Sequence, residues 1–127
     1  MKTIINSKNA PAPVGPYNQA ILAGNTLYVS GQIAIEPTSG VIITESIEAE
    51  TKQVLENLAA VLKEAGMGFE NIVKCSVFVT DMELFARINV VYSQYFEGLT
   101  APARELVQVA ALPKYVNIEI SCIAVMS

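Results

Sequence analysis

The sequence contains no histidine, and among its 127 residues there are only two cysteines. Without histidine there is no Ser-His-Asp triad, no Cys-His dyad and no HExxH zinc site. The two cysteines, Cys75 and Cys122, lie far apart in apolar segments, so there is no CxxC redox motif and no four-thiolate cluster. We therefore expect two buried free thiols without a catalytic role, and a protein that holds no metal.

Positive charge is also scarce. Eight Lys and Arg residues stand against twelve Asp and Glu residues, and only Arg87 and Arg104 are arginines. Without a basic run or stripe to neutralise phosphates, nucleic acid is not expected as the main ligand. The uncharged segment 9–35 is interrupted by proline and glycine, which excludes a membrane-spanning helix. Residues 1–6 lack the long apolar core of a signal peptide, and we expect a cytoplasmic protein.

The hydrophobic pattern predicts one domain over residues 1–127. Strands are predicted at residues 2–5, 19–23, 26–30, 71–80, 103–110 and 116–125, with a two-residue turn at Gly24-Asn25. Apolar residues at three- and four-residue steps predict a helix that Ser46 begins and Gly66 ends, and Asp81 is expected to cap a second helix. This order predicts an α+β fold: one mixed sheet with two helices packed on one face.

Two helices cover only one face of such a sheet. Successive side chains of a strand point to opposite faces of the sheet, so the sequence predicts the face of each residue. In segment 71–80, Val73 is expected on the same face as Cys75, Val77 and Val79. In the last strand, the residues expected to face away from the helices are Asn117, Glu119, Ser121 and Ile123. Because 52% of the residues are hydrophobic, we expect the uncovered face to be closed by oligomerisation.

Arg104 and Glu119 are the charged pair whose relative position the strand pattern predicts. If the last two strands form an antiparallel hairpin with Val109 opposite Val116, the two residues become diagonal neighbours, about 7–8 Å apart between backbones. One interpretation is a structural ion pair. The other is an arginine fork for a ligand carboxylate, with a glutamate nearby to hold or activate water.

Three further sites each allow a structural and a functional interpretation. Tyr17 is either a hydrophobic plug with its hydroxyl at the surface or a ligand contact. Ser30-Gly31 marks either a bulge or a place where a ligand or another backbone approaches closely. Asn89, beside Phe85 and Tyr92 on the predicted second helix, either bonds nearby backbone or positions a polar ligand.

Taken together, the motifs resemble those of the reactive intermediate deaminase (RidA, also called YjgF) family. They are GPYNQA at residues 15–20, YVSGQ at residues 28–32, Asn89-x-x-Tyr92, Pro102-Ala103-Arg104, Leu112-Pro113 and Glu119-Ile120. Their order and spacing cover essentially the whole chain. The resemblance implies a chorismate-mutase-like fold in a homotrimer, with active sites in the clefts between subunits. It also implies hydrolysis of 2-imino acids such as 2-iminobutanoate and 2-iminopropanoate to 2-keto acids and ammonia, without metal or organic cofactor.

The resemblance assigns roles to particular residues. Arg104 would clamp the substrate carboxylate, and Glu119 would orient or activate the attacking water. The other residues that would line the cleft are Tyr17, Ser30, Gly31, Asn89 and Leu106. This sequence departs from the common pattern at Leu106, where many members carry Cys, and at Glu105, where a small polar residue is frequent.

Three functions are consistent with these observations. The first is deamination, because a protonated imine is already electrophilic and needs little more than a fixed carboxylate and a positioned water. The second is binding of small carboxylates such as 2-keto acids in the same clefts without turnover. The third is translation inhibition or ribonuclease activity, against which the pI of about 4.7 counts.

Overall fold

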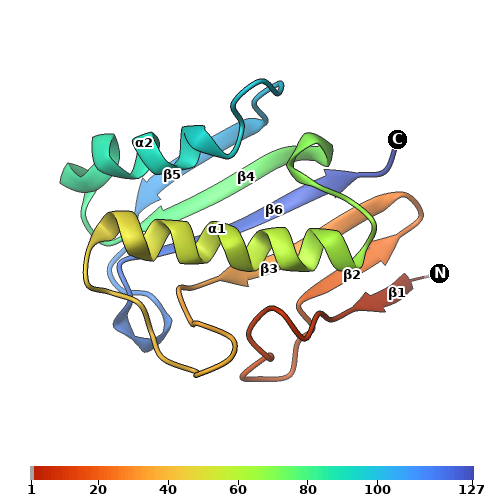
Figure 1. Cartoon of the computed structure of the whole chain (residues 1–127), viewed down its shortest axis with the longest axis horizontal. Coiled ribbons are helices and arrows are strands. Elements are labelled where there is room, and N and C mark those ends of the chain that lie inside the picture. Colours follow the sequence, from red (N-terminus) through yellow and green to blue (C-terminus); the bar gives the residue numbers. More distant parts are fainter. Residues whose placement is uncertain (1) are drawn as a thin grey trace.

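The computed structural model describes residues 2–127, and its secondary structure forms one mixed sheet with two α-helices (Figure 1). The strands are β1 (Lys2–Ile5), β2 (Ala20–Ala23), β3 (Thr26–Gln32), β4 (Ile72–Val79), β5 (Ala103–Gln108) and β6 (Ile118–Val125). The helices are α1 (Ile47–Glu64) and α2 (Phe85–Gln94), with short 3₁₀ turns η1 (Phe69–Asn71), η2 (Met82–Leu84) and η3 (Pro113–Tyr115). The predicted α+β class is confirmed.

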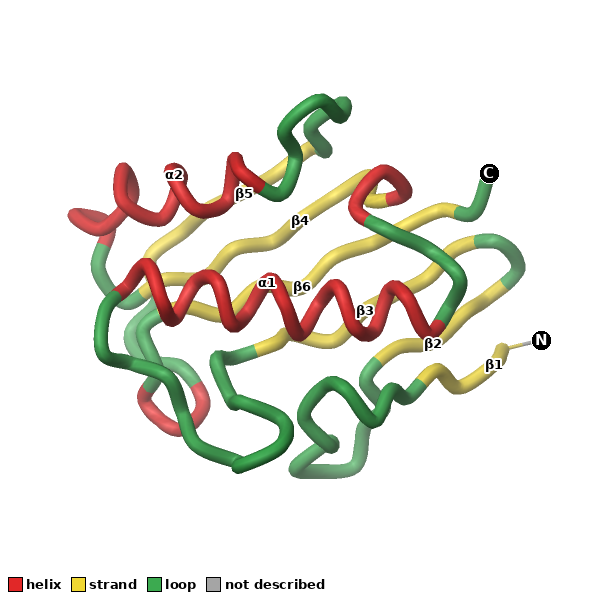
Figure 2. Tube along the Cα trace, viewed as in Figure 1, coloured by secondary structure: helices red, strands yellow, loops and turns green. Residues whose placement is uncertain are grey.

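Both helices lie on the same face of the sheet, as Figures 1 and 2 show. The strand order is β1-β2-β3-β6-β4-β5, and every neighbouring pair is antiparallel except β4 and β5. A parallel pair needs a crossover connection, and η2 and α2 provide it between β4 and β5. Within residues 2–127, no α-helix lies on the other face of the sheet.

Local sequence signals account for α1. The Ser46 hydroxyl accepts a hydrogen bond from Ala49 N at 3.0 Å, and Gly66, with φ of 74°, follows the helix end. The buried face of α1 also contains Glu50 and Asn57, which the apolar stripe did not predict. Glu50 accepts from the backbone N and side-chain Nδ2 of Asn117, each at 2.8 Å, and so connects α1 to the start of β6.

The predicted hairpin between the last two strands is wrong. β5 pairs only with β4, and β6 lies between β3 and β4. Arg104 is therefore opposite Cys75, whereas Glu119 is opposite Phe78, and the two charged residues are not diagonal neighbours. The prediction that Arg104 and Glu119 share one face of the sheet is wrong as well, because period-two alternation relates residues within one strand and holds no information about which strands pair.

The predicted face of Val73 is also wrong. The β4–β6 register shifts between Ile72 and Lys74, so that an extra residue lies there. Ile72 is buried and Val73 is 49% exposed, whereas Cys75, Val77 and Val79 are buried as predicted. The β-bulge thus changes the alternation at the first residues of this strand.

Candidate active site

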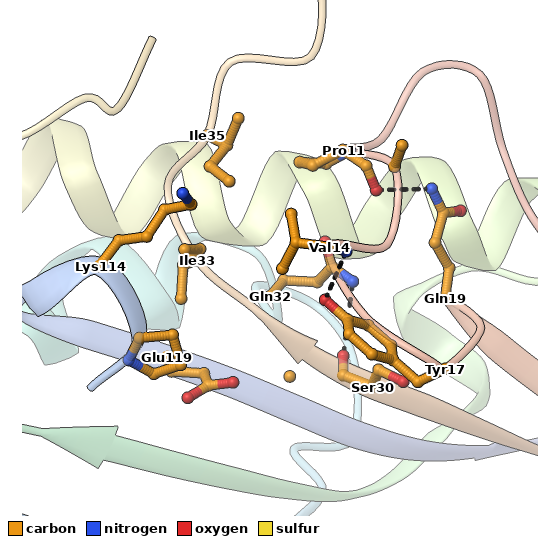
Figure 3. Close-up of a pocket in the computed structure, with 13 residues that line it drawn as sticks. Pro11, Val14, Tyr17, Gln19, Ser30, Gln32, Ile33, Ile35, Lys114 and Glu119 are labelled. Atoms are coloured by element: carbon orange, nitrogen blue, oxygen red, sulfur yellow. Dashed lines mark hydrogen bonds between the residues drawn. The ribbon is translucent and has the colours of Figure 1, made fainter. Parts of the chain in front are cut away.

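A cavity of about 380 Å³ lies where β3 ends and β6 begins, enclosed by the N-terminal loop and η3 (Figure 3). Its wall includes four of the residues predicted for the site: Tyr17, Ser30, Gly31 and Glu119. Pro11, Val14, Ile33 and Ile35 supply an apolar part of the wall. A largely apolar cavity with a few polar groups is the usual form of a small-molecule site.

Ser30 and Gly31 form a β-bulge. The register between β3 and β6 shifts between Val29 and Gln32, both of which are buried. A Cβ placed on Gly31 would lie 2.1 Å from Glu119 Oε2, so the missing side chain makes the space that the carboxyl occupies. The bulge interpretation of Ser30-Gly31 is therefore confirmed, and the group that approaches Gly31 in this chain is the Glu119 side chain, not another backbone.

Glu119 is half-buried beside this bulge and points to the face away from the helices, since its neighbours Ile118 and Ile120 are buried beneath them. It makes no hydrogen bond or ion pair with residues 2–127. Burial raises the pKa of its carboxyl above the ordinary value. An unpartnered carboxyl in a cavity is suited to accept a proton from a bound molecule.

The N-terminal loop brings Tyr17 to the cavity. The Tyr17 hydroxyl accepts from Val14 N at 3.3 Å, and the ring is 44% exposed, so it is not a buried plug. Gln19 holds the loop in place: its Oε1 accepts from Ser7 N at 2.6 Å, and its Nε2 donates to Pro11 O at 2.8 Å. Gln19 is buried and belongs to the GPYNQA segment, but no local pattern in the sequence indicates its structural role.

Two other residues at this end of the sheet were not predicted. Asn57 of α1 donates to Ile33 O and Ile35 O at 3.0 and 2.9 Å, which fixes the apolar wall. Lys114 of η3 lines the cavity and has a left-handed backbone with φ of 54°. Only long-range structure reveals these two roles, because neither residue lies in a predicted site motif.

Arg104, Asn89 and Leu106 lie elsewhere, on the face that the helices cover. Arg104 is paired with the buried Cys75, and its Nη1 donates to Asn89 Oδ1 of α2 at 2.7 Å. Leu106 is half-buried and packs against the core. Asn89 thus bonds a side chain and not nearby backbone, and the structural ion pair between Arg104 and Glu119 is excluded within one chain.

The two thiols have environments typical of structural cysteines. Cys75 and Cys122 are free thiols that lie opposite each other on the neighbouring strands β4 and β6. They are 0% and 3% exposed, respectively. Burial raises the pKa of both thiols. Residues 2–127 contain no cluster of three or more Cys, Asp or Glu side chains arranged to hold a metal ion. Within the same residues, no helix is long and apolar enough to cross a membrane.

The fold and the cavity together define a small α+β protein with a cavity whose form suits a small organic molecule. Comparisons with known proteins agree with this class. The family model described as Endoribonuclease L-PSP matches residues 7–126. The chain belongs to this family, which is the RidA/YjgF family that its motifs resemble.

Relatives and solved structures match over nearly the whole chain. A RutC family protein of Synechocystis is 56% identical over 97% of this chain and 95% of its own length. A rat protein named 2-iminobutanoate/2-iminopropanoate deaminase is 46% identical over 98% of this chain and 90% of its own length. The structure of E. coli TdcF with bound serine has a TM-score of 0.95 at 42% identity, covering 98% of this chain and 99% of that one.

Proposed function

We propose that this protein is an imine and enamine deaminase that hydrolyses 2-iminobutanoate and 2-iminopropanoate to 2-keto acids and ammonia. The observation that carries the proposal is the unpartnered carboxyl of Glu119, held beside the Gly31 bulge in the cavity. The names of the mammalian relatives support the same activity. The proposal includes no metal, organic cofactor or nucleic acid, and it assigns the reaction to the cytoplasm.

The reaction needs one base and one anchor. Glu119 removes a proton from water as the water oxygen attacks the imine carbon, and the C=N electron pair moves to nitrogen. Attack on the protonated imine gives a neutral carbinolamine, whose nitrogen takes the proton from Glu119. The C–N bond then breaks and ammonia leaves, while the hydroxyl proton passes to the Glu119 carboxylate as the oxygen forms the keto group. Glu119 finally releases that proton to solvent or to ammonia. Arg104 holds the substrate carboxylate in a bidentate pair throughout both steps.

Within one chain, Arg104 and Glu119 lie on opposite faces of the sheet, so one chain cannot bring both to one substrate. A second copy that presents its Arg104 to the cavity of the first would complete the site. Exposed apolar side chains on the face without helices favour such packing: Tyr28, Val73 and Val107 are each more than 40% exposed. We assign three such sites to a homotrimer, in the clefts between its subunits.

The test is ammonia release from imino acids generated in the assay by an amino-acid oxidase or dehydratase. Arg104→Ala is expected to abolish both turnover and binding of 2-oxobutanoate, and Arg104→Lys to fail nearly as badly, since an ammonium lacks the planar fork. Glu119→Gln is expected to retain binding. Keto-acid binding by the wild type without ammonia release would instead identify a carboxylate-binding protein, and salt-dependent RNA binding with cleavage would identify a ribonuclease.

A further inference from the structure

The guanidinium of Arg104 is surrounded by three side chains of α2. Besides the bond to Asn89, its carbon Cζ lies 4.8 Å from the ring centroid of Tyr92 and 5.8 Å from that of Phe85. These three helix residues are spaced by four and three positions, so they share one side of α2. Contact with the arginine therefore gives a physical reason for the spacing of Asn89-x-x-Tyr92.

None of these neighbours neutralises the arginine. Aromatic rings attract a cation through their quadrupole, and Asn89 accepts through a neutral amide oxygen. The ion pairs formed by residues 2–127 are Lys74–Glu105 and Arg87–Glu48, and neither includes Arg104. The surroundings of Arg104 thus restrain its planar group while its positive charge remains available to an external carboxylate.

The hydroxyl of Tyr92 has no part in this arrangement. It is buried and makes no hydrogen bond with the described residues. Burial, together with the neighbouring Cys75, raises the pKa of the phenol, so the hydroxyl stays protonated. The aromatic ring of Tyr92, and not its hydroxyl, is therefore the group that interacts with the Arg104 guanidinium.

We infer that Tyr92 and Phe85 are positioning residues, whose ring faces hold the Arg104 guanidinium in the orientation that takes the substrate carboxylate. The inference rests on the proposed function for its kinetic consequence. The restraint of Arg104 by the two rings does not depend on which reaction the protein performs.

Four variants distinguish the effect of the Phe85 and Tyr92 rings on substrate binding from that of the Tyr92 hydroxyl and from that of general packing. Phe85 is 39% exposed, so Phe85→Leu is expected to fold and to raise both KM and the Kd of 2-oxobutanoate about threefold. Tyr92→Leu removes the nearer ring and is expected to raise both about tenfold or more. Tyr92→Phe keeps the ring face and is expected to have the KM and the 2-oxobutanoate Kd of the wild type. Tyr95→Leu is the matched control, because the Tyr95 hydroxyl donates a hydrogen bond to Glu56 and its ring packs at a tilt against Phe69, not against Arg104.

Coupling distinguishes positioning from loss of stability. Because Arg104→Ala is expected to leave no turnover or binding to measure, the coupling is measured by urea denaturation. Phe85→Leu is expected to lower the free energy of unfolding less in an Arg104→Ala background than in the wild type, whereas a packing effect that does not involve Arg104 would be the same in both. Equal KM values for wild type, Phe85→Leu and Tyr92→Leu would overturn the inference. So would a Tyr92→Phe variant as impaired as Tyr92→Leu, or a Tyr95→Leu variant with the same rise in KM.

One measurement is independent of activity. The side-chain NMR signals of Arg104 are expected to show ring-current shifts that are reduced in Phe85→Leu, reduced further in Tyr92→Leu, where the nearer ring is lost, and retained in Tyr92→Phe. Unchanged Arg104 signals in both leucine variants would overturn the inference even in an active enzyme. Shifted signals in a wild-type protein that neither binds 2-oxobutanoate nor releases ammonia would overturn the proposed function alone.

Discussion

Glu119 combines two properties that oppose each other at the scale of a single residue. Its position in the cavity suits a proton acceptor, yet burial makes the charged form unfavourable and raises its pKa. The folded protein therefore binds this proton more tightly than the unfolded chain. Between the unfolded and folded pKa values, stability rises as the pH falls, and at neutral pH the ionised carboxyl lowers stability.

Glu119→Gln is therefore expected to lower kcat about a hundredfold or more, because the base is lost, while raising Tm at pH 7 by about 2 °C. The Tm difference should shrink as the pH falls through the folded pKa of Glu119. Steady-state kinetics and thermal melts between pH 4 and 8 provide both readouts. A Tm that falls in Glu119→Gln at pH 7 would show that the carboxyl stabilises the fold and would contradict this account.

Tyr115 is a second residue with an unfavourable feature, because its backbone has a positive φ while its exposed side chain offers little packing in return. It has φ of 54°, a region that costs L-residues about 1–2 kcal/mol, and its side chain is 89% exposed. Tyr115→Gly is expected to raise the free energy of unfolding by about 0.5–1 kcal/mol, as measured by urea denaturation. Tyr115→Ala removes the same side chain but keeps the unfavourable φ, so it should gain nothing. Equal gains from both substitutions would assign the effect to the side chain.

At the scale of single residues, the sequence predicted the direction of the Glu119 side chain but not which residues contact one another across the fold. Alternation along the last strand correctly placed Glu119 on the face away from the helices, because the period of two is local. The contact between Arg104 and Asn89 joins residues of β5 and α2, and the buried role of Gln19 joins the N-terminal loop to β2. Those contacts depend on pairing and packing that no local pattern specifies.

At the scale of elements, the β3 bulge is the feature that makes the cavity possible. It inserts an extra residue between Val29 and Gln32 and places a glycine where Glu119 needs space. Glycine and the turn signals predicted both this bulge and the ends of α1. The bulge near Val73 had no such signal, since apolar Ile72 and Val73 fit either face.

Gly31→Ala is accordingly expected to lower kcat at least tenfold with a small change in Tm. The new Cβ would lie 2.1 Å from the end of the Glu119 side chain, which can rotate away, so the fold survives while the base is displaced. Gly40→Ala is the matched control: no atom would crowd its Cβ, but φ is 75°, so Tm should fall and kcat should not. Kinetics and melting of the two variants test this opposite behaviour.

At the scale of the whole molecule, the sheet face without helices determines the expected assembly. The apolar composition predicted that this face would be covered, but composition does not select the number of subunits. The division of Arg104 and Glu119 between two faces adds a functional reason for association, which the wrong hairpin had hidden. Local patterns therefore predicted the layers, whereas only the strand order shows that Arg104 and Glu119 lie on different faces.

Sedimentation at micromolar concentration is expected to give a species three times the 13.7 kDa of the chain. A charge on the uncovered face should weaken association, so Val107→Lys is expected to sediment as a smaller species and to lose turnover. Arg87→Ala, which removes an exposed ion pair between the two helices, is the control that should leave the assembly intact. A monomeric wild type with full activity would contradict the shared site.

Complementation between inactive variants tests the sharing directly. Arg104→Ala and Glu119→Gln are each expected to be inactive alone. If every site takes its arginine and its glutamate from different subunits, random co-assembly of the two in equal amounts restores about one site in four. Co-assembly of wild type with the double variant is the control: about one site in four should work if the residues come from different subunits, and about one in two if they come from the same chain. Ammonia release per subunit, measured on co-expressed and purified oligomers, distinguishes these fractions, and no activity from the first mixture would return both residues to a single chain.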